Sequence, residues 1–202
     1  NQYGLPVEKV KCVFAGHNSK TDTSTARSKD YSSKNILFVG IDWERKGGPD
    51  LVDAFSIVQK EYPDATLTIV GARPKIENPR IRVIGQVPLD ALNAIYASAD
   101  IFCMPTYLEP FGIAFLEAMQ ARLPIVGSQV GAIPDFIQDG WNGWLVEPGD
   151  IQGIANALIK LLANPELCRQ MGERSLGLVQ ERYSWDAVGE KLQNHINGVL
   201  HD

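Results

Sequence analysis

The 202-residue sequence is poor in cysteine, has no long apolar run and has no block of basic residues. Its three cysteines, Cys12, Cys103 and Cys168, are far apart and lack metal-ligand spacing, so neither a disulfide framework nor a zinc site is expected. No apolar run approaches the length of a membrane span, and no signal peptide opens the chain, which together favour a cytoplasmic protein. The net charge of −5 without a basic patch argues against a nucleic-acid partner.

Length and composition indicate one globular domain preceded by a polar segment. The apolar fraction of 45% and the charged fraction of 21% are ordinary for a folded domain. From His17 to Lys34 the sequence is rich in Ser, Thr, Lys and Asp, which predicts a solvated linker rather than core. Before it, Lys9 to Ala15 has enough apolar residues for a short strand. We therefore assign residues 1–34 to a linker and residues 35–202 to the folded domain.

Strand and helix patterns alternate from Asn35 onward. Continuous apolar runs predict strands that are buried on both faces of a sheet, at residues 36–40, 66–70, 80–84, 100–104, 124–127 and 144–146. Helical patterns begin at Pro49, Pro88 and Ile113, and again after the capping residues Asp150, Asn164 and Ser184. This order predicts an α/β fold, namely a Rossmann-like parallel sheet with helices on both faces and extra C-terminal helices.

Two glutamates, separated by seven residues, flank the start of one predicted helix. Pro110 disfavours a helical conformation for Glu109, which places Glu109 in the loop before the helix, and Glu117 lies about two turns into it. The backbone N–H groups of residues 111–113 then lie at a helix N-terminus, where anions and above all phosphates are bound. Taken singly, Glu109 is better explained as an acid that favours the helix dipole, and Glu117 as an exposed helical charge.

A glycine-rich loop with one lysine follows the first predicted strand. In Gly40-x5-Lys46-Gly47-Gly48 the strand ends at Gly40, and a helix begins at Pro49. An amine at the carboxyl end of a parallel strand can neutralise a diphosphate, and glycines let backbone N–H groups approach it. The spacing matches neither a P-loop nor G-x-G-x-x-G, which argues against an ordinary ATPase or dinucleotide enzyme. A glycine turn with a solvated lysine is the simpler alternative.

These motifs occur in the order and spacing of a known family. Glu109-x7-Glu117, with Phe111-Gly112-Ile113 between, resembles the Glu-x7-Glu motif of retaining nucleotide-sugar glycosyltransferases of the GT-B fold, family four. The resemblance continues through residues 123–128, 131–135 and 139–150, and covers nearly all of the chain from Asn35 onward. It implies the C-terminal, donor-binding half of an enzyme that moves a hexose from a nucleotide-diphosphate sugar to an acceptor with retention at the anomeric carbon.

The resemblance also implies a role for each motif. Glu109 matches the glutamate placed against the transferred sugar and its departing phosphate, and is the one catalytic residue expected. Glu117 matches the glutamate that binds the ribose hydroxyls, since a carboxylate can accept hydrogen bonds from both. The base is expected beside Gln86 and Val87. The other expected substrate-binding residues are Gly40, Lys46, Gly47, Phe111, Gly112 and Ile113. Neither a metal nor another cofactor is implied, because lysine and the helix termini meet the phosphate charge.

The sequence departs from the family at one position near the diphosphate. Relatives usually carry an arginine directly after the strand-ending glycine, and this chain has Ile41 there. Arg45 is adjacent to Lys46 and is expected on a different side of an extended chain. Arg73, which follows the next strand, is the candidate substitute and is included among the expected substrate-binding residues.

The resemblance further implies a partner that the sequence does not contain. In the family an N-terminal domain supplies acceptor contacts and an important histidine, and residues 1–34 would be the connection to it. Membrane contact, if the enzyme makes any, would belong to that half. The sugar, the base and the acceptor are not encoded in these motifs. Two alternatives stay open: a nucleotide-sugar-binding module without chemistry, favoured by Ile41, and a GT-B epimerase.

Overall fold

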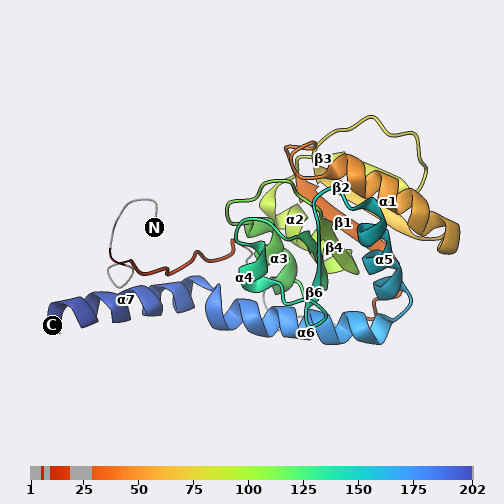
Figure 1. The fold of residues 1–202 in the computed structure, drawn as a ribbon. Coiled ribbons are helices and arrows are strands. Elements are labelled where there is room, and N and C mark those ends of the chain that lie inside the picture. The colour runs from red at the N-terminus through yellow and green to blue at the C-terminus, as the bar shows by residue number, and fades with distance from the viewer. Residues whose placement is uncertain (1–5, 7–9, 19–28, 202) are drawn as a thin grey trace.

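The computed structural model describes residue 6, residues 10–18 and residues 29–201 (Figure 1). Within this part, one parallel sheet has the strand order β3-β2-β1-β4-β5-β6. Its strands are β1 (Asn35–Gly40), β2 (Thr66–Gly71), β3 (Ile81–Gly85), β4 (Ile101–Met104), β5 (Ile125–Ser128) and β6 (Gly143–Val146). The helices are α1 (Gly48–Glu61), α2 (Leu89–Ser98), α3 (Ile113–Gln120), α4 (Ile133–Phe136), α5 (Ile151–Leu162), α6 (Pro165–Arg182) and α7 (Trp185–His201).

Helices cover both faces of the sheet, which explains the continuous apolar runs of its strands. Every residue of β4 and β5 is buried, because neither face of these central strands meets water. The helices α1 and α5 pack together on one face, and α3 packs against α6 on the other (Figure 1). The expected Rossmann-like architecture with extra C-terminal helices is therefore confirmed.

The strand order reverses direction between β1 and β4, so the switch point of the sheet lies outside the carboxyl ends of these two strands. From β1 the chain moves outward through β2 to β3, then returns to lay β4 on the other side of β1 and continues to β6. In open parallel sheets, ligands collect outside the carboxyl ends of the strands at such a reversal of direction. The loops after β1 and β4 lead directly into α1 and α3, so both helices begin at this point.

Local signals fix the ends of the C-terminal helices. Asp150 accepts a hydrogen bond from Gly153 N at 2.9 Å, Asn164 from Leu167 N at 3.0 Å, and Ser184 from Ala187 N at 3.1 Å. These are the expected N-caps of α5, α6 and α7. The short helix α4 was not expected, since its four residues carry too little periodic pattern to be recognised.

The polar N-terminal stretch differs from expectation where the structure describes it. Tyr31 is only 5% exposed, and its hydroxyl donates to Arg122 O at 2.7 Å, so this end of the linker joins the core. Residues 10–15 form no strand, and Lys9 lies outside the described residues. A strand needs a neighbouring strand for its backbone hydrogen bonds, whereas this segment runs beside helices, with His17 N donating to Tyr183 O at 3.0 Å. The boundary between a linker of residues 1–34 and a domain of residues 35–202 stays a prediction.

In the described part of the chain, no helix is both long enough and apolar enough to cross a membrane. The last helix, α7, extends beyond the sheet (Figure 1), and its side chains Trp185, Leu192 and Ile196 are exposed.

Two glycines of α6 provide a test of how tightly α6 packs. A Cβ on Gly172 would lie 2.2 Å from Arg122 O and 2.5 Å from Tyr31 Oη, whereas a Cβ on Gly177 would meet no atom within 4 Å. We predict that Gly172→Ala lowers the free energy of unfolding by roughly 1–3 kcal/mol through overpacking. The matched control Gly177→Ala should raise it by about 0.5–1 kcal/mol, because alanine favours a helix interior. Urea unfolding measures both, and equal effects would contradict this packing.

Candidate functional site

The loops that follow β1 and β4 contact each other directly at the switch point of the sheet. Arg45 O accepts hydrogen bonds from Tyr107 N at 2.9 Å and from Thr106 Oγ1 at 3.0 Å. Gly47 has φ of 70°, and a Cβ there would lie 1.9 Å from Pro105 O. Only glycine permits both the left-handed backbone and this close approach. The two sequence motifs therefore form one structural unit.

Lys46 and Glu109 meet at the centre of this unit. Lys46 Nζ lies 3.0 Å from Glu109 Oε2, and the two side chains are only 15% and 11% exposed. The lysine side chain reaches this position by crossing Gly40, where a Cβ would lie 2.3 Å from Lys46 Cδ. Burial of both charges is tolerable because each neutralises the other. The expected residues Gly40, Lys46, Gly47 and Glu109 are thus brought together.

Arg45 lies on the same carboxylate as Lys46, so the expectation that it would lie on a different side is wrong. Residues 43–47 form a turn rather than an extended segment, and Lys46 N donates to Asp42 O at 3.0 Å. Arg45 Nη1 donates to Leu108 O and lies 3.9 Å from Glu109 Oε2. Sequence reasoning missed this residue. The available signal was Asp42, an acid that can close such a turn with its own side chain.

The N-terminus of α3 forms the wall beside Glu109. Gly112 has φ of 94°, and a Cβ there would lie 3.2 Å from Glu109 Cγ. Ile113 is exposed at the first helical position. Phe111 is half-buried, and its ring packs against those of Phe136 and Tyr183, at centroid distances of 6.4 and 6.5 Å. The Phe111 ring thus belongs largely to an aromatic cluster, while the Phe111 backbone lies just before the N-terminus of α3.

Glu117 is buried without a charged partner. It is 8% exposed and takes part in no ion pair among the described residues. The hydroxyl of Tyr96, from α2, lies 3.1 Å from Glu117 Oε2 and 3.2 Å from Ala114 O. Burial raises the pKa of Glu117 above its ordinary value, and the hydrogen bond from Tyr96 acts in the opposite direction. Glu117 lies one turn along α3 from Ile113, on the same face of the helix.

Arg73, Gln86 and Val87 form a second group at the end of β3. The Arg73 side chain lies over Gly85, where a Cβ would be 2.6 Å from Arg73 Nε. Gln86 is exposed and Val87 half-buried. Gln86 and Val87 follow β3, which is two strands, or about 10 Å, from β1. Arg73 follows β2, the neighbour of β1, and its side chain lies on the β3 side, over Gly85, where the base is expected.

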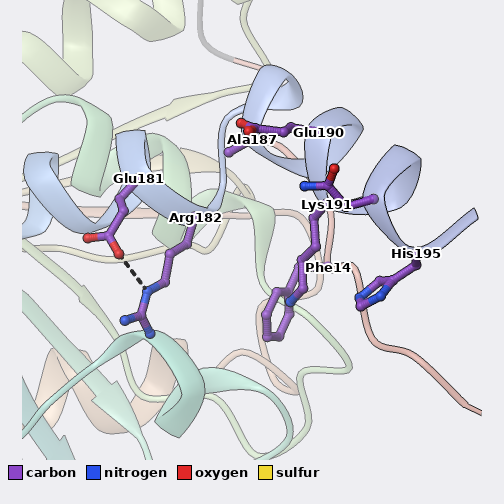
Figure 2. A pocket seen from close by; sticks show the side chains of 8 residues that line it. Phe14, Glu181, Arg182, Ala187, Glu190, Lys191 and His195 are labelled. Atoms are coloured by element: carbon purple, nitrogen blue, oxygen red, sulfur yellow. Dashed lines mark hydrogen bonds and ion pairs between the residues drawn. The ribbon is translucent and has the colours of Figure 1, made fainter. Parts of the chain in front are cut away.

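Two further features concern cofactors and cavities. Among the described residues, no group of three or more His, Cys, Asp or Glu side chains is arranged to hold a metal ion. That no metal is needed stays a prediction. A hollow of about 480 Å³ lies between Phe14 and the helices α6 and α7, and Figure 2 shows side chains that line it. Of its cations, Arg182 is paired with Glu181 at 3.3 Å and Lys191 lies over the Phe14 ring, and no predicted site residue lines the hollow.

Comparison with known proteins identifies relatives of the chain. It is 32% identical over 191 residues to N-acetyl-alpha-D-glucosaminyl L-malate synthase of Bacillus anthracis, covering 88% of this chain and 50% of the relative. It is 36% identical over 170 residues to phosphatidyl-myo-inositol mannosyltransferase of Mycobacterium leprae, covering 79% of this chain and 45% of the relative. The chain thus spans about half the length of these curated relatives.

Solved structures share the fold. The C-terminal domain of a glycosyl transferase group 1 family protein from Francisella tularensis has a TM-score of 0.70 and 25% identity, covering 86% of this chain and 97% of that one. The pneumococcal O-GlcNAc transferase GtfA, solved with UDP and GlcNAc, has a TM-score of 0.74 and 24% identity, covering 93% of this chain and 39% of that one. Residues 33–164 match the family described as glycosyl transferases group 1. Because this match covers more than half of the chain, the chain belongs to the group 1 glycosyl transferases.

Proposed function

We propose that the chain is the donor-binding half of a glycosyltransferase that uses a nucleotide-diphosphate sugar. The observation that carries the proposal is the contact of Lys46 with Glu109 at the switch point of the sheet, between two helix N-termini. The helices α1 and α3 both begin at a glycine, Gly47 and Gly112, without a side-chain cap. Helix starts of this kind and a lysine together suit a diphosphate.

In this proposal the diphosphate binds between Lys46 and the start of α3. The reaction breaks the bond between the anomeric carbon and the diphosphate, which leaves with the electron pair. The acceptor oxygen bonds to that carbon and gives its proton to an oxygen of the departing diphosphate. Lys46 and the helix N-termini offset the charge that grows on the leaving group, an electrostatic contribution to catalysis. Glu109 lies beside the transferred sugar, and retention at the anomeric carbon is proposed from the resemblance of its motif.

The nucleoside would extend from the diphosphate toward β3. Glu117, one turn along α3, would accept hydrogen bonds from the ribose hydroxyls, and the hydrogen bond from Tyr96 to its Oε2 supports this role. The base would lie near Arg73, Gln86 and Val87. The relatives' names and the UDP bound in GtfA support a nucleotide-sugar donor. They leave the base and the sugar open.

The acceptor site is proposed to lie in a second domain, since the chain spans about half the length of its curated relatives. We expect the 202-residue chain alone to bind the nucleotide but to transfer little or no sugar. A membrane acceptor would be met by that other domain. Sustained transfer to an acceptor by this chain alone would contradict the division of roles.

A panel of nucleotides tests the binding site. We predict that UDP, GDP or ADP, at about 100 times its dissociation constant, adds about 2.7 kcal/mol to the apparent stability, seen as a raised melting temperature. Glu117→Gln should weaken the binding of whichever nucleotide binds about 10- to 100-fold, because it removes charge-assisted hydrogen bonds to ribose. The control Glu61→Gln, at the exposed end of α1, should bind as the original chain does. If none of the three nucleotides binds, the proposed function is wrong.

The raised pKa of Glu117 predicts a pH dependence of binding. Only the ionised carboxylate accepts hydrogen bonds from both hydroxyls, so affinity should fall as pH falls through a pKa above the ordinary value for glutamate. Tyr96→Phe should move this fall to higher pH, because the Tyr96 hydrogen bond lowers that pKa. Calorimetric titration of the nucleotide across pH measures both effects. Glu117→Gln is the control, and retains only the titration of the phosphate.

Catalysis is tested in a protein that joins this chain to its second domain. Glu109→Gln should reduce kcat for sugar transfer at least about tenfold while nucleotide binding is retained, since the proposed role of Glu109 is at the sugar. The exposed Glu61→Gln serves again as the unchanged comparison. A joined protein that binds nucleotide sugar but transfers nothing would favour a binding module, and conversion of the sugar without acceptor would favour an epimerase.

A further inference from the structure

The position directly after the β1 strand carries no charge. Ile41 is 69% exposed, so its side chain contributes neither a cation nor much packing there. A diphosphate bears more than one negative charge, and Lys46 alone neutralises only part of it. A buried or half-buried anion that is not fully compensated binds weakly. Binding of a diphosphate therefore calls for a second cation near Lys46.

We propose that Arg45 is this second cation and that it binds the diphosphate of the nucleotide together with Lys46, an inference that rests on the proposed function. Arg45 Nη1 and Lys46 Nζ both lie within 4 Å of the same atom, Glu109 Oε2. Two cations gathered around one oxygen can also span neighbouring phosphate oxygens. The Arg45 side chain is 35% exposed, so a ligand bound beside Lys46 can reach it.

Asp42 holds the guanidinium in this orientation. Asp42 Oδ2 accepts from Arg45 Nε at 2.8 Å, and Asp42 Oδ1 accepts from Arg45 N at 3.3 Å. The hydrogen bond from Arg45 lowers the pKa of the Asp42 carboxyl, which keeps it charged. With Nε bound to Asp42, Nη1 lies toward Leu108 O and Glu109 Oε2. A guanidinium fixed in advance loses less conformational entropy when it binds an anion.

The other arginine considered for this role lies elsewhere. Arg73 is placed over Gly85, two strands from β1. A structural role for Arg45, limited to joining the two loops, is the remaining alternative. The two roles differ in what they do to ligands. If Arg45 binds phosphate, its loss should reduce the affinity for a nucleotide in proportion to the phosphate charge. If Arg45 only joins the two loops, its loss should reduce the affinity for every ligand of the site equally.

The experiment compares arginine variants by calorimetry of the chain. The ligands are whichever of UDP, GDP and ADP binds most tightly, together with the monophosphate and the nucleoside of the same base. Arg45→Gln should weaken the diphosphate about tenfold or more, the monophosphate less, and the nucleoside hardly at all. Arg82→Gln, an exposed β3 position outside the site, should bind all three as the original chain does. Asp42→Asn should weaken the diphosphate a few-fold, because Arg45 keeps its charge but loses its brace.

Each result decides between the alternatives. Unchanged diphosphate binding in Arg45→Gln, an equal loss for the nucleoside, or a diphosphate loss confined to Arg73→Gln would overturn the inference. If Arg45→Gln fails to fold, as judged by its melting temperature, Asp42→Asn decides, and unchanged diphosphate binding there overturns it. Absence of binding by the original chain would instead refute the proposed function. Loss in Lys46→Met without loss in Arg45→Gln would leave that function standing and refute only the role of Arg45.

Discussion

The contact between Lys46 and Glu109 depends on residues that are 63 positions apart in the chain. It exists because the strand order makes β1 and β4 neighbours, so that the loops after them meet at one edge of the sheet. Glycines permit the close approach. Gly47 passes against Pro105 O, and Gly131 passes against Glu109 O, where a Cβ would lie 1.8 Å away. The position of the carboxylate is thus set by backbone packing from three segments, rather than by its own rotamer alone.

The fold was largely predictable because its signals are local. Continuous apolar runs indicated β1 to β6, and the caps Asp150, Asn164 and Ser184 marked the starts of the last helices. Predictions failed where the decisive contacts were distant. The burial of Tyr31 depends on Arg122 O, 91 residues away, and nothing in the polar composition of its neighbourhood indicates it. The apolar residues 10–15 suggested a strand, but no strand of the described residues pairs with them.

The candidate site shows the same limit. The spacing of Glu109 and Glu117 and the glycines near Lys46 could be read directly, since loop and helix positions follow from Pro110 and the strand ends. The direction of Arg45 could not, because it depends on whether residues 43–47 extend or turn. Tyr96 was also not predictable as the partner of Glu117, since the two residues come from different helices. Sequence motifs therefore indicated the candidate site, while tertiary contacts determine how its charges are paired.

The two glutamates differ in their electrostatic surroundings, and this difference suits different roles. Glu109 is balanced by Lys46 and Arg45, so its own charge costs little, and a phosphate that approaches can share or take over these cations. Burial raises the pKa of Glu117, and the hydrogen bond from the neutral hydroxyl of Tyr96 offsets this rise only in part, which leaves the charge under-compensated. A carboxylate in that state gains most from additional neutral donors such as sugar hydroxyls. Under the proposed function, Lys46 and Arg45 therefore exchange Glu109 for the anionic diphosphate, while Glu117 accepts hydrogen bonds from the neutral ribose. The ribose hydroxyls would then stabilise the Glu117 charge, which the protein alone leaves under-compensated.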